Sequence, residues 1–428
     1  MIMKKLIPGR KQILLCLAAL SSCLSMPVLA QDEGVSDASA DSIMPRRIDL
    51  QTSRRDDNQA HEEWQGSFAL EGTDTRIKIG GFLQLDLMYD TNAMLSKGQF
   101  IPSTIVTRNA SKKDGSDGQT NFSASPSRLY VETRTRINQK RMKTLLSLDM
   151  FDDELGVDAK PHLRQAYVQL DDILFGGDLL IGQAWSTTTD LESAPDVLDF
   201  HSVDALFGKI QPQLRWSRDV ANGVKLMLAL ETADNHIIEG ADTLTRMPDG
   251  VLAVTWDSDS FKLMASLLAA DLRASFNNGP VKSVLGFGGS ISGKVKLPYG
   301  SYENDFMFSA AYGRGIASHF YDGQPDAVFD PATSNLELLK GFGVTLAYSH
   351  GWNEQMKSTF TYCCVEIQNH DAQSPESFHY SEYSSGNLVW TMNTHWLLGV
   401  EGIWGKRKDN DGMMGSNFRT QFTSRVSF

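Results

Sequence analysis

The sequence predicts an all-β fold, namely a transmembrane up-and-down antiparallel β-barrel of about 16 strands with a constriction loop folded into it. Three observations predict it. Apolar and polar side chains alternate along many segments, long and short connections alternate between those segments, and an export signal precedes them. Lipid-facing and lumen-facing residues must alternate in such a barrel, which explains the first observation.

The last twelve residues, 417–428, show the alternation most clearly. Phe418, Phe422 and Val426 share one face with the terminal Phe428, while the interleaved positions are polar or basic. A strand of a soluble sandwich would alternate in a similar way. Bacterial outer-membrane barrels, however, commonly end on such a strand with a final Phe, so the pattern favours the barrel.

The N-terminus has the pattern of a secretory signal peptide over residues 1–30. Four basic residues precede the apolar run 13–20, and Val28, Leu29 and Ala30 offer a cleavage site. A lipoprotein cleavage before Cys23 is the alternative, but apolar sequence continues beyond Cys23. We expect a cleaved signal peptide and a location in the outer membrane of a Gram-negative cell.

Composition narrows the function further. The formal net charge of -12 becomes -16 when residues 1–30, with four cations and no acids, are removed. An acidic chain is a poor nucleic-acid binder, although its lumen can be locally basic. Beyond residue 30 no apolar run approaches the roughly 18 residues of a membrane helix, so an exported chain is either soluble or a barrel.

Cysteine and histidine usage gives no sign of a cofactor. Cys363 and Cys364 are adjacent, so a strand would point them to opposite faces, and they suit no ordinary structural disulfide. No Cys/His spacing indicates zinc. We therefore expect no metal and no cofactor.

The chain divides into a signal peptide, a polar periplasmic arm over residues 31–72 and a barrel over residues 73–428. The arm is rich in charged residues. Strands 77–89 and 129–137 then alternate clearly. Further strands are expected at 142–151, 162–170, 178–185, 209–216, 224–232, 250–256, 261–271, 281–296, 303–313, 341–350, 356–366, 386–392 and 396–404, before the closing strand.

Long connections, such as 91–126 and 186–208, alternate with short ones such as 351–355. An up-and-down barrel with small periplasmic turns and larger external loops has this rhythm, whereas a sandwich does not require it. A barrel of this size is wide enough for an aqueous channel. Ten aromatic residues fall near strand ends, where they favour the headgroup level or, alternatively, pack in a core: Tyr89, Tyr130, Tyr167, Trp185, Trp216, Trp256, Tyr312, Trp390, Trp396 and Trp404.

Basic residues on the polar faces of the strands are the candidate solute-contacting side chains. Guanidinium groups suit carboxylates, so a lumen lined with them would select anions. The alternative is a generic wet lining in which they pair with Glu132, Glu231 and Glu401. The candidate pore-lining residues are Arg128, Arg134, Arg136, Arg215, Lys225, Arg419 and Arg425. The parity of Arg164 leaves its face undecided.

The connection 186–207 mixes acidic and apolar residues and is too hydrophobic for a solvated loop. We expect it to fold into the channel as a constriction, with folding over the mouth as the alternative. Signals for catalysis are weak. The Gly-rich stretch 286–293 lies in strand-like sequence, and no nucleophile elbow appears, so the chain is not expected to be an enzyme.

Several motifs resemble the DcaP-like family of outer-membrane porins from residue 66 to the end. They are GSFALEGTDTRIKIGGFLQLDLMYD (66–90), FIPSTI (100–105), SASPSRLYVETRT (123–135), LRQAYVQL (163–170), GQAWSTTTDLESAPDVLDF (182–200), QPQLRW (211–216) and WGKRKDNDG (404–412). The resemblance implies a homotrimer of sixteen-stranded channels that take up small anions, particularly dicarboxylates. It makes Arg128, Arg134 and Arg215 the leading anion contacts. The arm 31–65 lacks the sustained heptads that family members can carry.

We therefore expect a porin for passive uptake of small hydrophilic solutes, with anions such as dicarboxylates as the expected class. Its expected partners are those solutes, outer-membrane lipid and lipopolysaccharide. A non-selective or sugar-preferring porin is the alternative, followed by an outer-membrane hydrolase or a structural surface barrel. The overall acidity of the chain is expected to sit largely in external loops, where it could bind divalent ions.

Overall fold

The computed structural model describes residues 64–428 apart from 111–114, 139, 152–158, 278 and 301. The predicted signal peptide and most of the predicted arm lie outside the described residues. No helix among those residues is long and apolar enough to cross a membrane.

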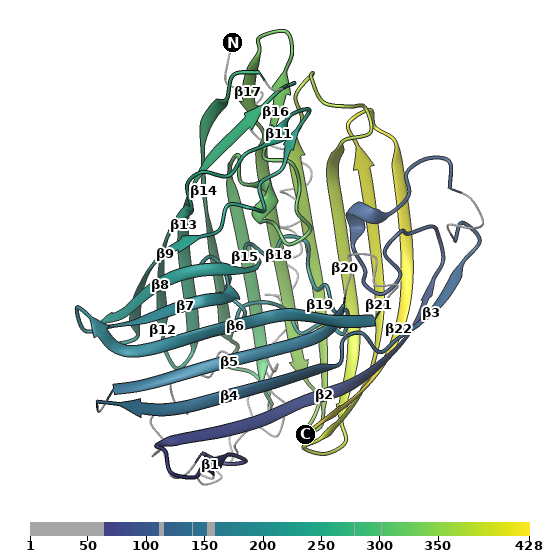
Figure 1. Ribbon diagram of the computed structural model, residues 1–428. Coiled ribbons are helices and arrows are strands. Elements are labelled where there is room, and N and C mark those ends of the chain that lie inside the picture. The colour runs from purple at the N-terminus through teal and green to yellow at the C-terminus, as the bar shows by residue number, and fades with distance from the viewer. Residues whose placement is uncertain (1–63, 111–114, 139, 152–158, 278, 301) are drawn as a thin grey trace. The chain divides into compact units, whose positions relative to one another are not determined.

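Sixteen antiparallel strands form the closed barrel that the sequence predicts (Figure 1). They are β2 (Thr75–Asp90), β4 (Arg128–Ile137), β5 (Lys140–Phe151), β6 (Ala159–Leu174), β7 (Gly177–Trp185), β8 (Ile210–Ala221), β9 (Val224–Glu231), β12 (Asp249–Asp257), β13 (Phe261–Ser275), β14 (Lys282–Lys296), β15 (Asn304–Arg314), β18 (Lys340–Gly351), β19 (Met356–Gln368), β20 (Phe378–Thr391), β21 (Trp396–Asp409) and β22 (Met414–Ser427).

The ring closes between its first and last strands. One edge of β2 pairs with β22, and the other edge pairs with β4. The backbone of Phe428 also exchanges two hydrogen bonds with Gly81, of 3.2 and 3.0 Å. Closure satisfies the backbone groups of both edges, which lipid cannot do.

Short elements decorate this ring. β1 (Phe68–Leu70), β3 (Gln119–Ser123) and β11 (Asp242–Thr243) extend the main sheet, while β10 (Ile238–Glu239), β16 (Ala327–Asp330) and β17 (Asn335–Leu338) form a separate three-stranded sheet. Within the described part of the chain, the 3-10 turns η1 (Pro102–Thr104) and η3 (Ala317–His319) lie in long connections.

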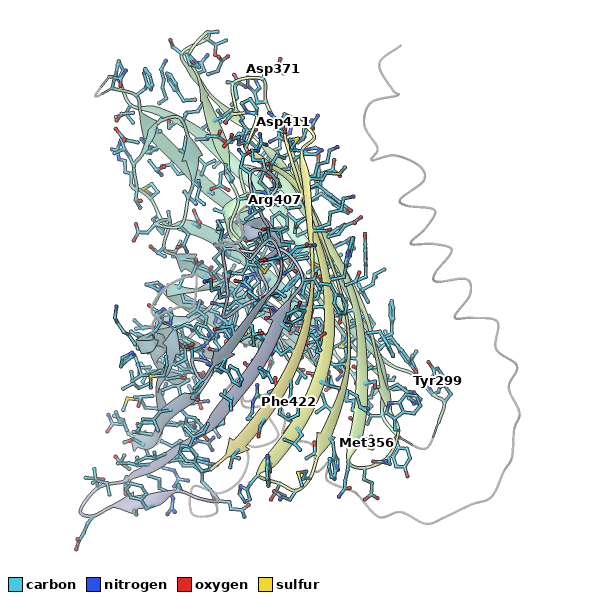
Figure 2. All side chains as sticks on the ribbon, turned by 90° about the vertical axis from the view of Figure 1, so that its right-hand side faces the viewer. Tyr299, Met356, Asp371, Arg407, Asp411 and Phe422 are labelled. Carbon is cyan, nitrogen blue, oxygen red and sulfur yellow. The ribbon has the colours of Figure 1, made fainter. Side chains whose placement is uncertain are left out.

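The two ends of the barrel differ as the connection lengths predict. Tyr299 and Met356 lie at the end with short turns, while Asp371 and Asp411 lie at the end with long loops (Figure 2). Along each strand apolar side chains face out. In β22, for example, Phe422 is 45% exposed and the neighbouring Thr423 is 0% exposed.

Glycines on the inner wall let long loops pack against it. A Cβ at Gly405 would lie 2.5 Å from Phe100, and one at Gly399 would lie 2.6 Å from Leu198. These distances are below van der Waals contact, so only glycine fits there without a shift of the loop.

The structure departs from the sequence predictions in several places. β20 begins at Phe378, not near residue 386, because the polar segment before it still alternates in the sheet. β1 lies within the predicted arm and pairs with β2. The girdle assignment is wrong for three of the ten aromatic residues, which belong to the inner face or lie buried at its rim: Tyr130, Tyr167 and Trp185.

Candidate functional site

The connection between β7 and β8, residues 186–209, folds into the barrel as predicted; it is called the constriction loop below. It begins at the Glu231 carboxylate of β9, which accepts hydrogen bonds from the Ser186 hydroxyl (2.7 Å) and the Thr187 N–H (2.6 Å). Glu231 is 1% exposed. A buried carboxylate therefore fixes the point where the loop leaves the wall.

Two lysines of the opposite wall hold the middle of the constriction loop. Lys262 Nζ lies 3.4 Å from Asp190 and 3.1 Å from Glu192. Lys357 Nζ lies 2.7 Å from Asp196. Because β13 and β19 lie on different parts of the wall, these ion pairs stretch the loop across the lumen.

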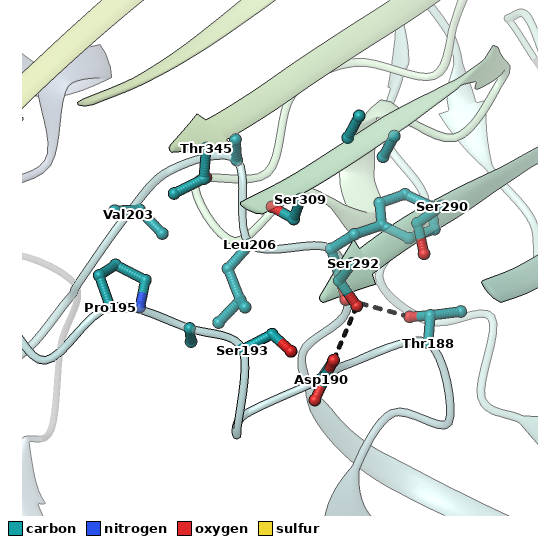
Figure 3. Close-up of a pocket in the computed structure, with 15 residues that line it drawn as sticks. Thr188, Asp190, Ser193, Pro195, Val203, Leu206, Ser290, Ser292, Ser309 and Thr345 are labelled. Atoms are coloured by element: carbon teal, nitrogen blue, oxygen red, sulfur yellow. Dashed lines mark hydrogen bonds between the residues drawn. The ribbon is translucent and has the colours of Figure 1, made fainter. Parts of the chain in front are cut away.

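Where the loop passes β14 and β15 it packs closely on the wall (Figure 3). The Ser292 hydroxyl donates to Asp190 at 2.9 Å. The cavity left between loop and wall holds about 20 Å³, lined by Thr188, Ser193, Leu206 and hydroxyl-bearing wall residues. This is room for about one water, so solute does not pass on that side of the loop.

Glu401 of β21 anchors the far end of the loop. Its Oε2 accepts from the backbone N–H of Leu198 (2.7 Å) and Asp199 (3.0 Å). Gln421 donates to the Leu198 carbonyl at 3.1 Å. The Asp199 carboxylate in turn accepts from the Phe100 N–H at 2.9 Å, which ties the constriction loop to the β2–β3 connection.

Apolar packing completes the inner assembly. Phe207 pairs through its backbone with Phe320 of the β15–β18 connection, and their rings are 5.6 Å apart. Both side chains belong to a buried cluster that also contains Val203 and Trp185. The lumen thus contains a hydrophobic core made by loops, which explains why the constriction loop is more apolar than a solvated loop.

Burial shifts the pKa values of ionisable groups in this assembly. It raises the pKa of Asp199 to about 7 against the lowering effect of Arg419, and the pKa of Asp322 to about 6. Burial, with Asp322 nearby, raises the pKa of Asp204 well above its usual value, and burial lowers that of His201 to about 3. The loops therefore carry less charge near neutral pH than their sequence suggests.

The expected concentration of acidity in external loops is wrong for this assembly. Buried carboxylates lie on the constriction loop and on the wall facing it, namely Asp190, Asp199, Asp204, Glu231 and Glu401. Most of them accept hydrogen bonds from backbone or hydroxyl groups, so they hold the loops. The sequence pattern identifies the acidic residues, but it does not reveal which distant backbone or hydroxyl groups donate hydrogen bonds to them.

All seven predicted pore-lining cations are on the inner face by strand register, and they fall into four settings. Two of them, Arg134 and Arg136, belong to a basic arc, which we define as the inner-face cations in the halves of β2, β4 and β5 next to the short turns. Its members are Arg76, Lys78, Arg134, Arg136, Arg141 and Lys143, and the inner-face acid among them is Glu132.

Like charges face one another directly in the basic arc. Arg134 of β4 is in register with Arg76 on one side and Lys143 on the other, and Arg136 is in register with Arg141. Glu132 lies 2.9 Å from Arg134 and 3.8 Å from Lys143. Directly opposed like charges destabilise a sheet, so this arrangement does not serve folding.

A second pair of cations flanks one aromatic ring. The guanidinium carbons of Arg128 and Arg425 lie 5.5 and 4.5 Å from the ring centre of Phe82. Arg425 also donates to Gln84 at 2.7 Å. The Phe82 ring holds both guanidinium groups, and the Gln84 amide also holds that of Arg425.

Arg215 and Lys225 lie on neighbouring strands. Arg215 has no hydrogen-bond or ion-pair partner within the part of the chain that the structure describes, and it is in register with Leu180 and Ala229. Lys225 is in register with Asp219 at a short turn. Arg215 is half-buried, and its guanidinium interacts electrostatically with the Glu231 carboxylate of β9.

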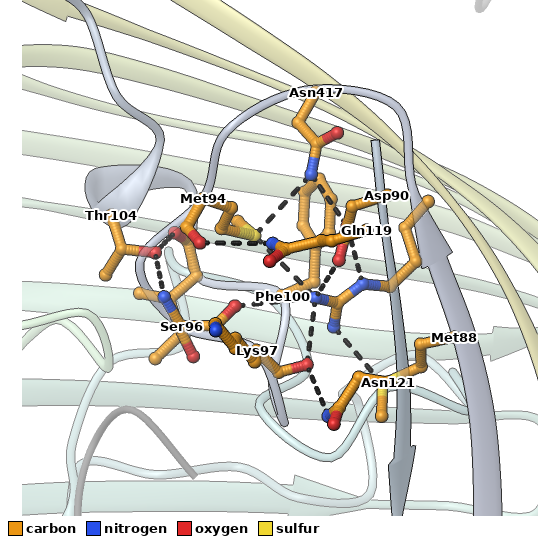
Figure 4. Close-up of polar contacts among 12 residues, drawn as sticks. Met88, Asp90, Met94, Ser96, Lys97, Phe100, Thr104, Gln119, Asn121 and Asn417 are labelled. Atoms are coloured by element: carbon orange, nitrogen blue, oxygen red, sulfur yellow. Dashed lines mark hydrogen bonds and ion pairs between the residues drawn. The ribbon is translucent and has the colours of Figure 1, made fainter. Parts of the chain in front are cut away.

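Arg419 has a different setting from the other six. It is 0% exposed, and its Nε and Nη2 donate to the two oxygens of Asp90 at 2.9 and 2.8 Å. Its Nη2 also donates to the carbonyls of Ser96 and Lys97, in the network around Asp90 that Figure 4 shows. This guanidinium fastens the β2–β3 connection to the wall.

Two members of the basic arc cannot be recognised from the sequence of one strand alone. Arg76 and Lys143 belong to the basic arc through cross-strand register, which a period of two within one strand does not specify. The anchoring lysines, Lys262 and Lys357, likewise show no local signal. Arg164, undecided from its parity, is buried and donates to Asp149 at 3.0 Å next to a strand irregularity.

The family model described as "DcaP outer membrane protein" matches residues 64–428. No curated protein gives a significant match. Among solved structures, the outer membrane channel DcaP of Acinetobacter baumannii is similar with a TM-score of 0.73 at 18% identity, covering 85% of this chain and 100% of that one.

Two further structures share the fold at lower similarity. An anion-selective porin from Comamonas acidovorans has a TM-score of 0.56 at 10% identity, covering 83% of this chain and 100% of its own. OmpT of Vibrio cholerae in its trimer form has a TM-score of 0.51 at 10% identity, covering 83% and 99%. These TM-scores show a shared barrel fold.

Proposed function

The chain belongs to the DcaP outer membrane protein family, and from that premise we propose that it is a porin for passive uptake of small hydrophilic anions. Dicarboxylates are the proposed preferred class, because two guanidinium or ammonium groups a few ångströms apart suit two carboxylates on one solute. The chain is an outer-membrane protein, and we propose that a signal peptide ending near residue 30 exports it.

The basic arc is the observation that carries the anion preference. Six inner-face cations in three adjacent half-strands accompany one inner-face acid, Glu132, in a chain whose net charge is -12. A focused positive region in a water-filled lumen raises the local concentration of anions. Arg128, Arg425 and Arg215 would continue this surface towards the constriction loop.

Assembly is the second part of the proposal. We propose a homotrimer embedded in lipid and lipopolysaccharide, since the Vibrio cholerae OmpT structure is described in a trimer form. The anion-selective porin of Comamonas acidovorans is consistent with the proposed preference at the level of fold.

The test is the reversal potential of the purified protein in a planar bilayer under a salt gradient, with and without succinate. We expect anion preference and transient block by the dicarboxylate. The variant R134Q/K143Q should lower the anion-to-cation permeability ratio on the order of 5-fold, because a unit charge about 4 Å away in water contributes about 1 kcal/mol.

The matched control is R218Q/K140Q, which removes the same two charges from the outer face of strands near the same end. It should leave the permeability ratio unchanged. Cation preference without succinate block in the wild-type protein would contradict the proposal. That result would favour a non-selective porin, in which the carboxylates of the constriction loop offset the positive charge of the basic arc.

A further inference from the structure

Three potential metal ligands meet behind the constriction loop, at the long-loop end of the barrel. His236 comes from the β9–β12 connection, Asp249 begins β12, and His319 ends η3. Their ligand atoms all lie within 4.8 Å of one another. All three residues are buried, at 7%, 0% and 3% exposure.

The distances suit one small ion. Asp249 Oδ2 lies 3.0 Å from His236 Nε2 and 3.1 Å from His319 Nε2. Ligands at about 2.0–2.2 Å from a zinc ion lie roughly 3.3–3.5 Å apart at tetrahedral angles. All three ligand atoms lie within 4.8 Å of one another, so a movement of the imidazole side chains around Asp249 would bring them to these spacings.

One atom of this cluster is unsatisfied. Asp249 Oδ1 is buried and has no hydrogen-bond partner among the described residues. A buried carboxylate oxygen without a partner is costly. A cation bound to the Asp249 carboxylate would offset that cost.

A fourth side chain holds the two histidine-bearing segments in place. Asp326 accepts the Ile237 N–H at 3.1 Å and the Ser318 N–H at 2.8 Å, and it is 0% exposed. These donors are the chain neighbours of His236 and His319. The carboxylate thus orients both segments towards Asp249 and adds negative charge beside the cluster.

We propose that His236, Asp249 and His319 bind a divalent transition-metal ion of the zinc class. Two imidazoles and one carboxylate form a ligand set that such ions prefer, and three protein ligands leave a coordination position for water. Hard ions such as Mg²⁺ and Ca²⁺ favour all-oxygen sites and would bind weakly. The sequence shows no spacing motif because the ligands come from three separate segments.

The ion would act as a clamp on the constriction loop. The His319 carbonyl accepts the Gly208 N–H of that loop at 2.7 Å, and the Phe207 ring lies 6.1 Å from the His319 ring. Fixing His319 to β12 therefore fixes the end of the constriction loop. This inference does not depend on the solute that the channel prefers.

The first experiment measures zinc binding to the full mature chain, without an affinity tag, after treatment with a chelator. Equilibrium dialysis should give one Zn²⁺ per chain that competing Mg²⁺ or Ca²⁺ does not displace. H236A and H319A should each weaken binding on the order of 100-fold or more, as loss of a ligand exceeds the effect of losing a supporting contact. H395A, a histidine in a short turn at the other end, is the matched control and should bind as the wild type does.

Wild-type protein loaded with Co²⁺ provides a test that does not depend on how well the variants fold. Visible d–d absorption bands of a four- or five-coordinate Co²⁺ with nitrogen ligands, removed by one equivalent of Zn²⁺, would support the site. Binding of Zn²⁺ to wild type no tighter than to the H236A/H319A variant would overturn the proposal. The cluster would then be a hydrogen-bonded triad in which both imidazoles donate to Asp249.

Discussion

At the scale of single residues, the Arg419–Asp90 pair shows how a lumen cation becomes part of the framework. Both side chains are almost fully buried, at 0% and 1% exposure, and the carboxylate is bound at both oxygens. A pair of this kind repays its desolvation only while both partners are present. Removing either one leaves a buried charge without compensation.

Substituting Arg419 by Met should therefore destabilise the barrel by about 3–5 kcal/mol, since Asp90 is left uncompensated. The measurement is unfolding by denaturant in detergent micelles. The double variant D90L/R419M should recover most of the loss, because neither charge remains. R141M, which breaks the half-exposed pair with Asp171, is the control and should cost at most about 1 kcal/mol. Equal losses in R419M and R141M would contradict this interpretation.

Which face a side chain takes can be predicted from the sequence, because the strand period of two fixes it. The residues that the side chain contacts on that face cannot be predicted in this way. Arg425 and Arg419 are six residues apart on the same face of β22, yet one lies at the Phe82 ring and the other under the β2–β3 connection. The difference depends on where a distant loop folds, and no local pattern encodes that contact.

At the scale of elements, the constriction loop depends on a few wall residues. Glu401 accepts two consecutive backbone N–H groups of the loop, those of Leu198 and Asp199. Burying those donors without an acceptor costs about 1–3 kcal/mol each. Segment 196–199 lies far from both attachment points of the loop, so its position is sensitive to this one carboxylate.

The E401A variant should therefore loosen segment 196–199 and raise both the single-channel conductance and the open-channel noise. We expect a conductance increase on the order of tens of per cent, since the wall lysines still hold Asp190 and Asp196. E401Q keeps an acceptor oxygen and should behave much more like the wild type. A conductance of E401A equal to that of E401Q would show that Glu401 does not hold the constriction.

The sequence was sufficient to predict the strands, the alternation of connection lengths and the loop that folds inward. It was insufficient for the ends of β20 and for the small sheet of β10, β16 and β17. These segments are two to four residues long or polar on both faces, and tertiary pairing decides their conformation. The inner-wall glycines, including Gly399 and Gly405, make sense only once the packed loop side chains are known.

At the scale of the whole molecule, the net charge of the chain and the charge of the basic arc have opposite signs. The chain is acidic overall, but much of its interior acidity is hydrogen-bonded, ion-paired or protonated near neutral pH, as at Asp199. The basic arc faces the lumen at the short-turn end. Local field and not net charge therefore determines which ions enter.

This difference predicts how the selectivity depends on salt. The Debye length is about 10 Å at 0.1 M and about 3 Å at 1 M ionic strength, so the field of the basic arc reaches across an open lumen only at low salt. Reversal potentials measured at a fixed concentration ratio should show anion preference near 0.1 M that largely disappears near 1 M. The R134Q/K143Q variant should show little preference at either concentration. A wild-type preference that does not change with salt would instead place the selectivity in close contacts at Arg128, Arg215 and Arg425, where screening is weak.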